Sequence, residues 1–433
     1  MRHLRMIRQD AAPRGRRAQP STRTAGRLDP TKHWFTTDVA LVLVSASAWG
    51  FAFSTFYLLP RFLTQELGAG PADIGLVVGL LGVSTVLFTL ATAGWMERFS
   101  RRRAMTLGAL AMSVAAFGFT AVHSLGPLIE ALRVLQGVSY ALVVTAFGTL
   151  IAELVPHERL SHALGVGGSS MLVMNAIAPA VGEPLAAAVG WRVVFVSAGV
   201  MALVAVALTT RIREPIRQVH PGARGGLLEV LRQPLAHQYA LILVLTGAGF
   251  GTVFAFQGPH ALALGRARAG GFFVAYAVAA IFVRVGFGHL ADRLGRHRVA
   301  LAAVLIYAAV VLAMADLRPG ALEVYGAIFG LSHGVFYPAI NALAIGAARP
   351  SERARITAIF TGSFSLGLWL GPTVLGSIAE RDGYPLVFVL ASAGILVAAI
   401  LLLRSPELRA AGLPPGRMRT PEIEEEVSAP GFG

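Results

Sequence analysis

The sequence contains no cysteine and only one lysine, Lys32, among its 433 residues. Without cysteine the chain has no disulfide, no thiol nucleophile and no thiolate metal ligand. Charged residues make up only 14% of the chain, whereas a typical soluble domain has about 25%. Hydrophobic residues make up 55%, and the mean hydropathy is +0.65. These proportions exclude an ordinary soluble domain and indicate a protein embedded in a membrane.

Several motifs and side-chain arrangements that the sequence lacks exclude or disfavour classes of function. The sequence has no Gly-x-x-x-x-Gly-Lys-[Ser/Thr] segment for binding ATP phosphates, which disfavours an ATP-driven pump. It has no recognisable nucleophile–base pair or metal-ligand cluster, so we expect neither an enzyme nor a cofactor or metal. No apolar run carries a carboxylate at its centre, which argues against a multiply cationic substrate.

Long apolar runs dominate the chain instead. A run of roughly 20 apolar residues can cross the hydrocarbon core of a bilayer as a helix, the form that satisfies its own backbone polar groups in lipid. The sequence therefore predicts an all-α integral membrane protein with twelve transmembrane helices. We expect them at residues 38–59, 74–95, 104–123, 127–150, 164–189, 191–210, 238–257, 270–290, 298–315, 321–346, 356–378 and 384–403.

The net charge of +14 is distributed unevenly between the two sides of these runs. Of the 37 Lys and Arg residues, 29 fall in the termini and in alternate loops, and two, Arg133 and Arg284, fall within runs. This asymmetry predicts that both termini are cytoplasmic, and it explains the basic charge without nucleic acid. Six arginines fall in the opposite loops: Arg61, Arg192, Arg266, Arg268, Arg318 and Arg381.

Several segments occur twice at an offset of 193–195 residues, which predicts two homologous halves. The repeated pairs are 93–103 with 288–298, 156–159 with 350–353, Pro179 with Pro372, and 190–195 with 383–388. The polar stretch between the sixth and seventh runs marks the boundary, and its residues 227–232 suggest a short amphipathic piece on the membrane surface. We expect a basic, disordered tail (1–33), a first half (34–211), a cytoplasmic linker (212–237), a second half (238–404) and a cytoplasmic tail (405–433).

The second copy of the longest repeat, Gly-His-Leu-Ala-Asp-Arg-Leu-Gly-Arg-His-Arg over 288–298, resembles the signature of the major facilitator superfamily. The first copy departs from it at Ala93, Glu97 and Ser100. The resemblance implies two pseudo-symmetric six-helix halves and a latch that holds the inner side closed. Arginines that merely fix the topology are the alternative. The latch residues would be Glu97, Arg98, Gly288, Asp292, Arg293 and Arg296. Arg284 is expected to join them, because Arg284, Gly288 and Asp292 are spaced at intervals of four residues on one helix face.

Residues 133–141 resemble the Arg-x-x-Gln-Gly-x-x-x-Ala motif of proton-coupled members of this superfamily. The resemblance makes Arg133 and Gln136 candidates for coupling. A buried guanidinium cannot release its proton, so Arg133 would tune a neighbouring group or bind an anion. A structural arginine that reaches towards the membrane surface is the alternative.

Three other residues are candidates for proton coupling. Asp38 opens the first run, where helix capping is a sufficient explanation. Glu183 lies near the outer surface, and simple solvation is its alternative. His333 lies in the middle of a run and titrates near neutrality when unperturbed, although a neutral, hydrogen-bonded histidine is equally consistent.

Residues 175–183 resemble an exporter-associated Gly-Pro-x-x-Gly-Gly pattern in which Ala178 and Glu183 replace two glycines. Proline removes a helix hydrogen bond and glycine permits close packing, so we expect a kink and a tight helix contact here and at the repeated position. Prolines are common in membrane helices, which is the structural alternative. The residues concerned are Pro179, Gly182, Gly371 and Pro372.

Aromatic and polar side chains on several runs are candidates for lining a substrate cavity. Aromatic rings with few polar groups suit a moderately apolar organic molecule, although aromatic residues also face lipid. The candidates are Trp49, Phe53, Tyr140, Phe250, Phe254, Gln257, His333, Tyr337 and Asn341.

Residues 272–292 and 330–341 resemble a bacterial subgroup of the superfamily often described as arabinose-efflux-like. The resemblance implies a monomeric secondary transporter of the bacterial inner membrane that exports a small organic molecule in exchange for protons, working by alternating access. One alternative is a proton symporter that imports a sugar, an organic acid or a metallophore. Another is a receptor or scaffold that does not transport.

Overall fold

The computed structural model describes residues 34–96, 99–214, 234–266, 268–286, 294–347 and 353–411. The first half consists of long helices joined by short turns. In chain order these are α1 (Thr37–Thr55), the 3₁₀ turn η1 (Phe56–Leu58), α2 (Leu59–Leu67), α3 (Pro71–Met96), α4 (Arg101–Gly118), η2 (Phe119–Ala121), α5 (Pro127–Leu154), α6 (His157–Val189) and α7 (Trp191–Thr209).

The second half repeats this plan with one additional short helix at its end. It contains α9 (Pro234–Ala263), α10 (Gly270–Gly286), α12 (Arg296–Ala313), the turns η3 (Met314–Asp316) and η4 (Pro319–Ala321), α13 (Leu322–Ala347), α14 (Arg353–Asp382), α15 (Tyr384–Arg404) and α16 (Pro406–Ala411).

The predicted twelve-helix membrane fold is confirmed. Eleven helices in the described part of the chain are long and apolar enough to cross a bilayer, and the remaining span corresponds to the shorter apolar helix α10. The first span extends further than expected, because η1 and α2 continue α1 as far as Leu67.

Local sequence explains where several helices begin. The Thr36 hydroxyl accepts a hydrogen bond from the backbone nitrogen of Val39, and Ser100 does the same for Arg103. Gly190 and Gly383 each link two consecutive helices with a positive φ, of 91° and 83°, which residues with side chains rarely adopt. These two glycines occupy repeated positions, so the repeat seen in the sequence is also a repeat of backbone geometry.

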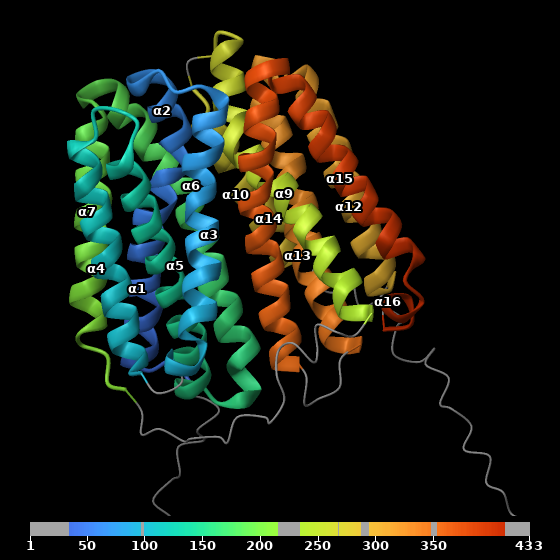
Figure 1. Ribbon diagram of the computed structural model, residues 1–433. Coiled ribbons are helices and arrows are strands. Elements are labelled where there is room, and N and C mark those ends of the chain that lie inside the picture. The colour runs from blue at the N-terminus through green and yellow to red at the C-terminus, as the bar shows by residue number, and fades with distance from the viewer. Residues whose placement is uncertain are drawn as a thin grey trace, which may run out of the picture.

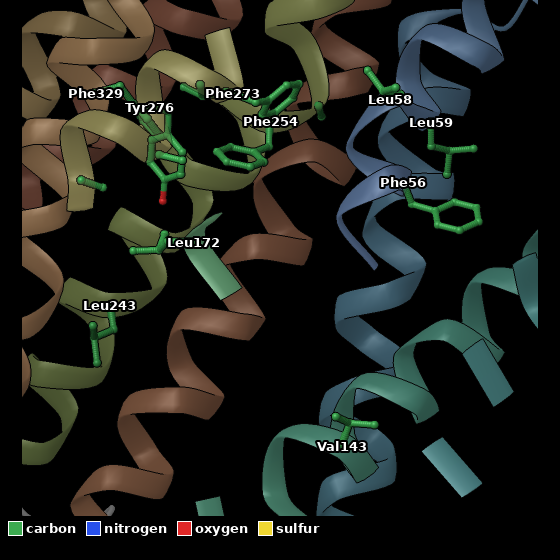
Figure 2. Close-up of a cluster of buried hydrophobic side chains, with 14 of the residues drawn as sticks. Phe56, Leu58, Leu59, Val143, Leu172, Leu243, Phe254, Phe273, Tyr276 and Phe329 are labelled. Carbon is green, nitrogen blue, oxygen red and sulfur yellow. The ribbon is translucent and has the colours of Figure 1, made fainter. Parts of the chain in front are cut away.

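The helices form two bundles, with α1–α7 on one side of the molecule and α9–α16 on the other (Figure 1). Each bundle has its own apolar packing. Figure 2 shows Phe254, Phe273, Tyr276 and Phe329 gathered in the second bundle, and Phe56 on the first. The apolar side chains that face outwards suit a lipid environment, since the helices are hydrophobic on all sides.

The two bundles meet mainly where α3 packs on α14 and α6 packs on α10, with smaller contacts of α9 with η1, α2 and α3. The first contact is very close, because a Cβ atom added to Gly75 would lie 2.1 Å from the carbonyl oxygen of Pro372. We call the end of the molecule that holds Gly70, Glu183 and Gly383 the clamped side. The end that holds Thr36, Glu214 and Ala411 is the termini side.

Several predictions fall on residues outside the described part of the chain. These are the basic tail, most of the 212–237 linker with its amphipathic piece, and the C-terminal tail beyond Ala411. Five of the latch residues, Glu97, Arg98, Gly288, Asp292 and Arg293, also lie there.

Candidate functional site

A cavity of about 260 Å³ lies between the two bundles, which is room for a small organic molecule. Its wall comes from helices of both halves, and we call it the central cavity. Of the nine cavity candidates, seven line it: Trp49, Phe53, Tyr140, Phe250, Phe254, His333 and Tyr337. Sequence reasoning missed several other wall residues, among them Tyr57, Asn175, Tyr276 and Phe364.

The remaining two cavity candidates are not wall residues. Gln257 is buried on α9, and Asn341 is half-buried on α13. The side-chain oxygen of each is buried without a hydrogen-bond partner. Both residues belong to helices that contribute to the cavity wall, but neither is itself a wall residue.

Aromatic rings form much of the wall in both halves. Trp49 stacks on Phe53 with 5.2 Å between the ring centroids, and its indole nitrogen donates to the Ser139 hydroxyl at 2.9 Å. In the second half Phe250 stacks on Phe254 at 4.2 Å. Towards the clamped side, Tyr57 stacks on Phe273 at 5.5 Å, so an aromatic contact joins the two halves there.

Arg133 is a buried wall residue whose hydrogen bonds go to uncharged groups. Its Nε donates to the Val77 carbonyl at 2.9 Å, and one terminal nitrogen donates to the Val78 carbonyl at 3.0 Å. The other terminal nitrogen donates to Gln136 Oε1 at 2.6 Å. The motif at 133–141 thus fixes the guanidinium against α3 without an acidic partner.

His333 lies in the wall with only one of its ring nitrogens bonded. Its Nδ1 lies 3.1 Å from the Tyr276 hydroxyl, and its Nε2 is buried without a partner. The ring centroid is 4.6 Å from that of Phe250, and the residue is only 6% exposed. One nitrogen is therefore available for a ligand or a proton.

Arg284 also lines the central cavity, although its spacing from Gly288 and Asp292 led us to expect it in a latch. Its Nε is buried without a hydrogen-bond partner. The other latch residue in the described part, Arg296, begins α12 away from the cavity wall. The latch itself stays a prediction.

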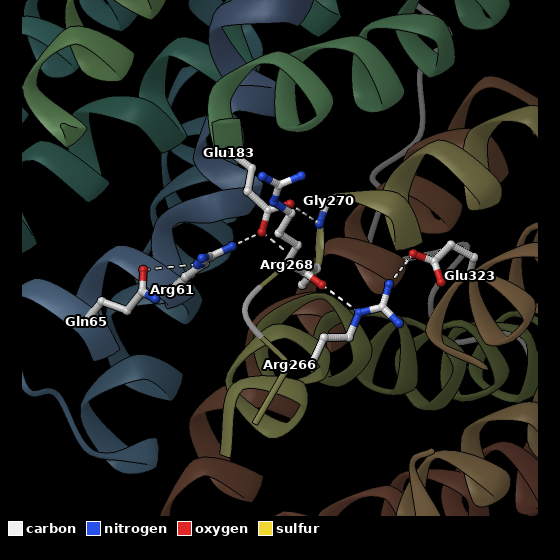
Figure 3. A network of polar contacts seen from close by, with 8 residues as sticks. Arg61, Gln65, Glu183, Arg266, Arg268, Gly270 and Glu323 are labelled. Carbon is white, nitrogen blue, oxygen red and sulfur yellow. Dashed lines mark hydrogen bonds and ion pairs between the residues drawn. The ribbon is translucent and has the colours of Figure 1, made fainter. Parts of the chain in front are cut away.

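Glu183 makes direct contacts between the two halves at the clamped side (Figure 3). Its carboxylate accepts hydrogen bonds from the backbone nitrogens of Ala269 and Gly270, both at 2.7 Å, and forms an ion pair with Arg61. Ala269 and Gly270 lie at the beginning of α10, where the helix dipole favours a negative charge. The expected alternative for Glu183, simple solvation, is wrong, because the side chain is only 6% exposed.

We call Arg61, Glu183, Ala269 and Gly270 the Glu183 clamp. Arg268 lies near Arg61 (Figure 3), so each half supplies one arginine beside the Glu183 carboxylate. A Cβ atom on Gly270 would lie 2.6 Å from Glu183 Oε2, which means that the contact depends on glycine at this position. The neighbouring pair of Arg266 and Glu323 joins the 264–269 connection to α13 within the second half.

A second carboxylate also connects the two halves, but here the second half supplies the carboxylate and the first half supplies the beginning of the helix. Glu380, near the end of α14, accepts a hydrogen bond at 3.2 Å from the backbone nitrogen of Ala72, in the first turn of α3. A Cβ atom on the preceding Gly70 would lie 2.5 Å from this carboxylate. We call Gly70, Ala72 and Glu380 the Glu380 clamp.

The candidate kink residues lie within continuous helices. Pro179 interrupts the hydrogen-bond ladder of α6, and Pro372 does so in α14. Gly182 and Gly371 allow close contacts, because their added Cβ atoms would lie 2.9 Å from Leu58 Cδ1 and 2.2 Å from the Ala248 carbonyl oxygen. The proline–glycine pairs therefore place α6 and α14 close to their neighbours beside the two clamps.

Asp38, the remaining coupling candidate, lies at the termini side rather than in the cavity. Its Oδ1 accepts a hydrogen bond from the backbone nitrogen of Arg213 at 2.9 Å, which connects the first turn of α1 to the segment after α7. Among the residues that the structure describes, no group of three or more His, Asp or Glu side chains could hold a metal ion.

Comparison with known proteins is consistent with this architecture. The family profile described as Major Facilitator Superfamily matches residues 40–315 and 241–429, which together span most of the sequence. The chain belongs to the Major Facilitator Superfamily. It is therefore a membrane transporter with the fold of this superfamily, and it is not an enzyme.

Two relatives illustrate the range of similarity within this family. The chain is 28% identical to the "Multi-drug resistance efflux pump PmrA" of Streptococcus pneumoniae, over 76% of this chain and 86% of the relative. It is 24% identical to an uncharacterized MFS-type transporter of Burkholderia mallei, over 82% and 89% of the two chains.

Solved structures share the fold at low sequence identity. A mutant form of the nucleoside transporter NupG superposes with a TM-score of 0.72 and 13% identity, covering 84% of this chain and 98% of that one. The inward-open xylose transporter XylE from E. coli gives a TM-score of 0.67 and 15% identity, covering 84% and 95%.

Proposed function

We propose that this transporter exports a small organic molecule across the bacterial inner membrane in exchange for protons. The relative named as an efflux pump and the aromatic cavity between the halves support the proposal. Both halves contribute to this cavity. This supports the proposal, because alternating access exposes a binding site between two bundles first to one side of the membrane and then to the other.

We further propose that the clamped side faces the outside of the cell and the termini side faces the cytoplasm. The arginine asymmetry of the sequence supports this orientation. In this arrangement the two clamps and the Gly75–Pro372 contact close the outer end of the cavity. Rocking of the halves would separate α3 from α14 and α6 from α10 to release the substrate outwards. The predicted latch would act at the inner side, and the protein would work as a monomer.

For proton coupling we propose His333, supported by Arg133 and Gln136 in the other half. His333 lines the cavity and its buried Nε2 has no partner, so proton binding and substrate binding would influence each other. His333→Gln should flatten the pH dependence of efflux while transport at high pH continues. Arg133→Lys should impair transport although the charge is kept, since lysine cannot reproduce the three fixed bonds to Val77, Val78 and Gln136. An unchanged pH profile of His333→Gln would assign the histidine a structural role.

Transport assays with inverted membrane vesicles separate this function from its alternatives. The probes are naphthalene-2-sulfonate, a trimethyl(2-naphthylmethyl)ammonium salt and xylose, each radiolabelled. Accumulation of a naphthalene compound that depends on an imposed proton gradient supports export. Accumulation of xylose alone in right-side-out vesicles supports the importing symporter. If none of the three compounds moves in either orientation, the proposed export of naphthalene-sized organic ions is rejected.

A further inference from the structure

The central cavity holds positive charge, and its described wall holds no negative charge. Arg133 and Arg284 are wall residues, and none of the other described wall residues is Asp or Glu. Arg133 is bonded to two carbonyl groups and one neutral amide, which leave its charge uncompensated. Arg284 forms no ion pair with a carboxylate in the part of the chain that the structure describes.

Uncompensated charge inside a membrane protein is costly and usually marks a functional site. A cationic substrate would increase this cost, because it would meet both guanidinium groups and no carboxylate. An anionic group would lower it, since an ion pair and charge-assisted hydrogen bonds would replace the missing partners.

Two wall residues each have a buried hydrogen-bonding atom without a partner in the described part of the chain. Arg284 Nε and His333 Nε2 are both buried without partners, and both residues line the cavity. His333 lies between Tyr276, whose hydroxyl is 3.1 Å from its Nδ1, and Tyr337, whose ring centroid is 5.5 Å from its own, and these three residues line the cavity together with Arg284. Arg133 has already committed three of its nitrogens to protein groups and mainly contributes its charge.

The wall beside this polar end accepts a flat apolar body. The Phe250 ring lies 4.6 Å from the His333 ring and stacks on Phe254, and Phe364 lies 5.7 Å from Phe250. Trp49 and Phe53 present stacked rings from the first half. An aromatic ring system could pack against these faces while its acidic group reached Arg284.

We propose that the substrate is an organic anion with a flat apolar body, whose carboxylate, sulfonate or phosphate group binds Arg284 and His333. The inference rests on the proposed function in so far as the ligand of this cavity is the transported molecule. It assigns Arg284 to substrate binding, a role different from the latch that its sequence spacing suggested.

Equilibrium binding to the purified full-length protein in detergent tests the proposal by calorimetry. The probes share one ring system and differ in charge: naphthalene-2-sulfonate, 2-naphthalenemethanol and a trimethyl(2-naphthylmethyl)ammonium salt. The anion should bind about tenfold or more tightly than the neutral alcohol, as expected for a charge-assisted hydrogen bond, and the cation should bind least.

Substitutions then locate the anion site. Arg284→Gln should abolish the preference for the anion and leave binding of the alcohol within about threefold, because only the charged contact is lost. Arg284→Lys should restore part of the preference. Arg404→Gln is the matched control, since Arg404 is an exposed arginine at the end of α15 in the same half. Size-exclusion profiles establish that each variant is folded.

Three results would overturn the proposal: a cation that binds as tightly as the anion, no detectable binding of the anion to folded protein, or equal weakening of all three probes by Arg284→Gln. These outcomes are separable from failure of the proposed function. Anion binding without vesicle transport contradicts export but keeps the site. Proton-driven transport of the naphthyl cation alone keeps export and rejects the anionic substrate.

Discussion

Glu183 and Glu380 both cross between the halves, and both accept hydrogen bonds from the backbone at the beginning of a helix, yet their surroundings differ. Glu183 is buried, accepts two bonds of 2.7 Å and pairs with Arg61. Glu380 is exposed, accepts one bond of 3.2 Å, and forms no ion pair among the described residues. Equivalent helices of a duplicated fold thus carry one strong and one weak connection.

We call the contacts α6–α10 and α14–α3 the two seams between the halves. The difference between the two carboxylates shows that a pseudo-symmetric carrier can give its two seams unequal roles. An exposed carboxylate retains much of its hydration, so its bond contributes little to closure. A buried, paired carboxylate leaves an uncompensated arginine and two unbonded amides when it is removed. We therefore expect the α6–α10 seam to control closure of the clamped side, with the α14–α3 seam closed mainly by packing.

Removal of the Glu183 carboxylate should have the largest effect. Breaking a buried ion pair costs about 3–5 kcal/mol, which is enough to reverse a two-state equilibrium. Glu183→Ala should therefore expose the cavity to the clamped side and strongly reduce transport. In the cysteine-free chain, a Ser365→Cys reporter in the cavity wall should react about tenfold faster or more with an impermeant thiol reagent added outside intact cells.

Glu66→Ala is the matched control for this experiment, because Glu66 is an exposed carboxylate on α2 at the same side. Equal labelling of the Glu183→Ala and Glu66→Ala proteins would mean that the Glu183 clamp does not hold the cavity closed. The expected dominance of the α6–α10 seam in closing the cavity would then be contradicted.

A methyl group at Gly75 should have an intermediate effect, and it tests the packing of the other seam. The added Cβ would lie 2.1 Å from the Pro372 carbonyl oxygen, so α3 and α14 must separate. Overpacking of this kind costs about 1–3 kcal/mol. Gly75→Ala should lower transport roughly threefold to tenfold at matched expression. Gly148→Ala on α5, which has open space around the new Cβ, should behave like the unmodified protein; similar losses in both variants would point to a general effect of alanine.

The smallest effect is expected for Glu380→Gln, because an exposed single bond contributes about 0–1 kcal/mol. Initial transport rates should stay within about threefold of the unmodified protein, and the thermal unfolding midpoint should shift less than for Glu183→Gln. A shift as large as that of Glu183→Gln would show that the two clamps are energetically equivalent, contrary to their burial.

The fold could be predicted from the sequence because membrane helices are recognisable from local composition alone. Apolar runs of the required length and repeated loops were sufficient to place twelve helices in two halves. Spacing could also have revealed Tyr57, which follows Trp49 and Phe53 at intervals of four residues on the same helical face.

The contacts that close the molecule could not be predicted in this way. Glu183 and its partner Gly270 are 87 residues apart, and their contact depends on how two helices of different halves pack. Arg284 is a second example, since its spacing from Gly288 and Asp292 predicts a latch contact but gives no sign that it also lines the central cavity. Local sequence shows that a charge is inside the membrane, but only tertiary packing shows what it faces.

The two wall arginines also make the carrier responsive to membrane voltage. In an energised cell the interior is negative, and one charge gains about 2.3 kcal/mol per 100 mV in crossing that field. An empty cavity that has two arginines and no carboxylate in its described wall is expected to be more stable when it is open to the negative interior. A bound anion cancels part of that charge and reduces the voltage dependence of the outward step. In the proposed export cycle, the resting potential would therefore favour the return of the empty carrier to the cytoplasm-facing state.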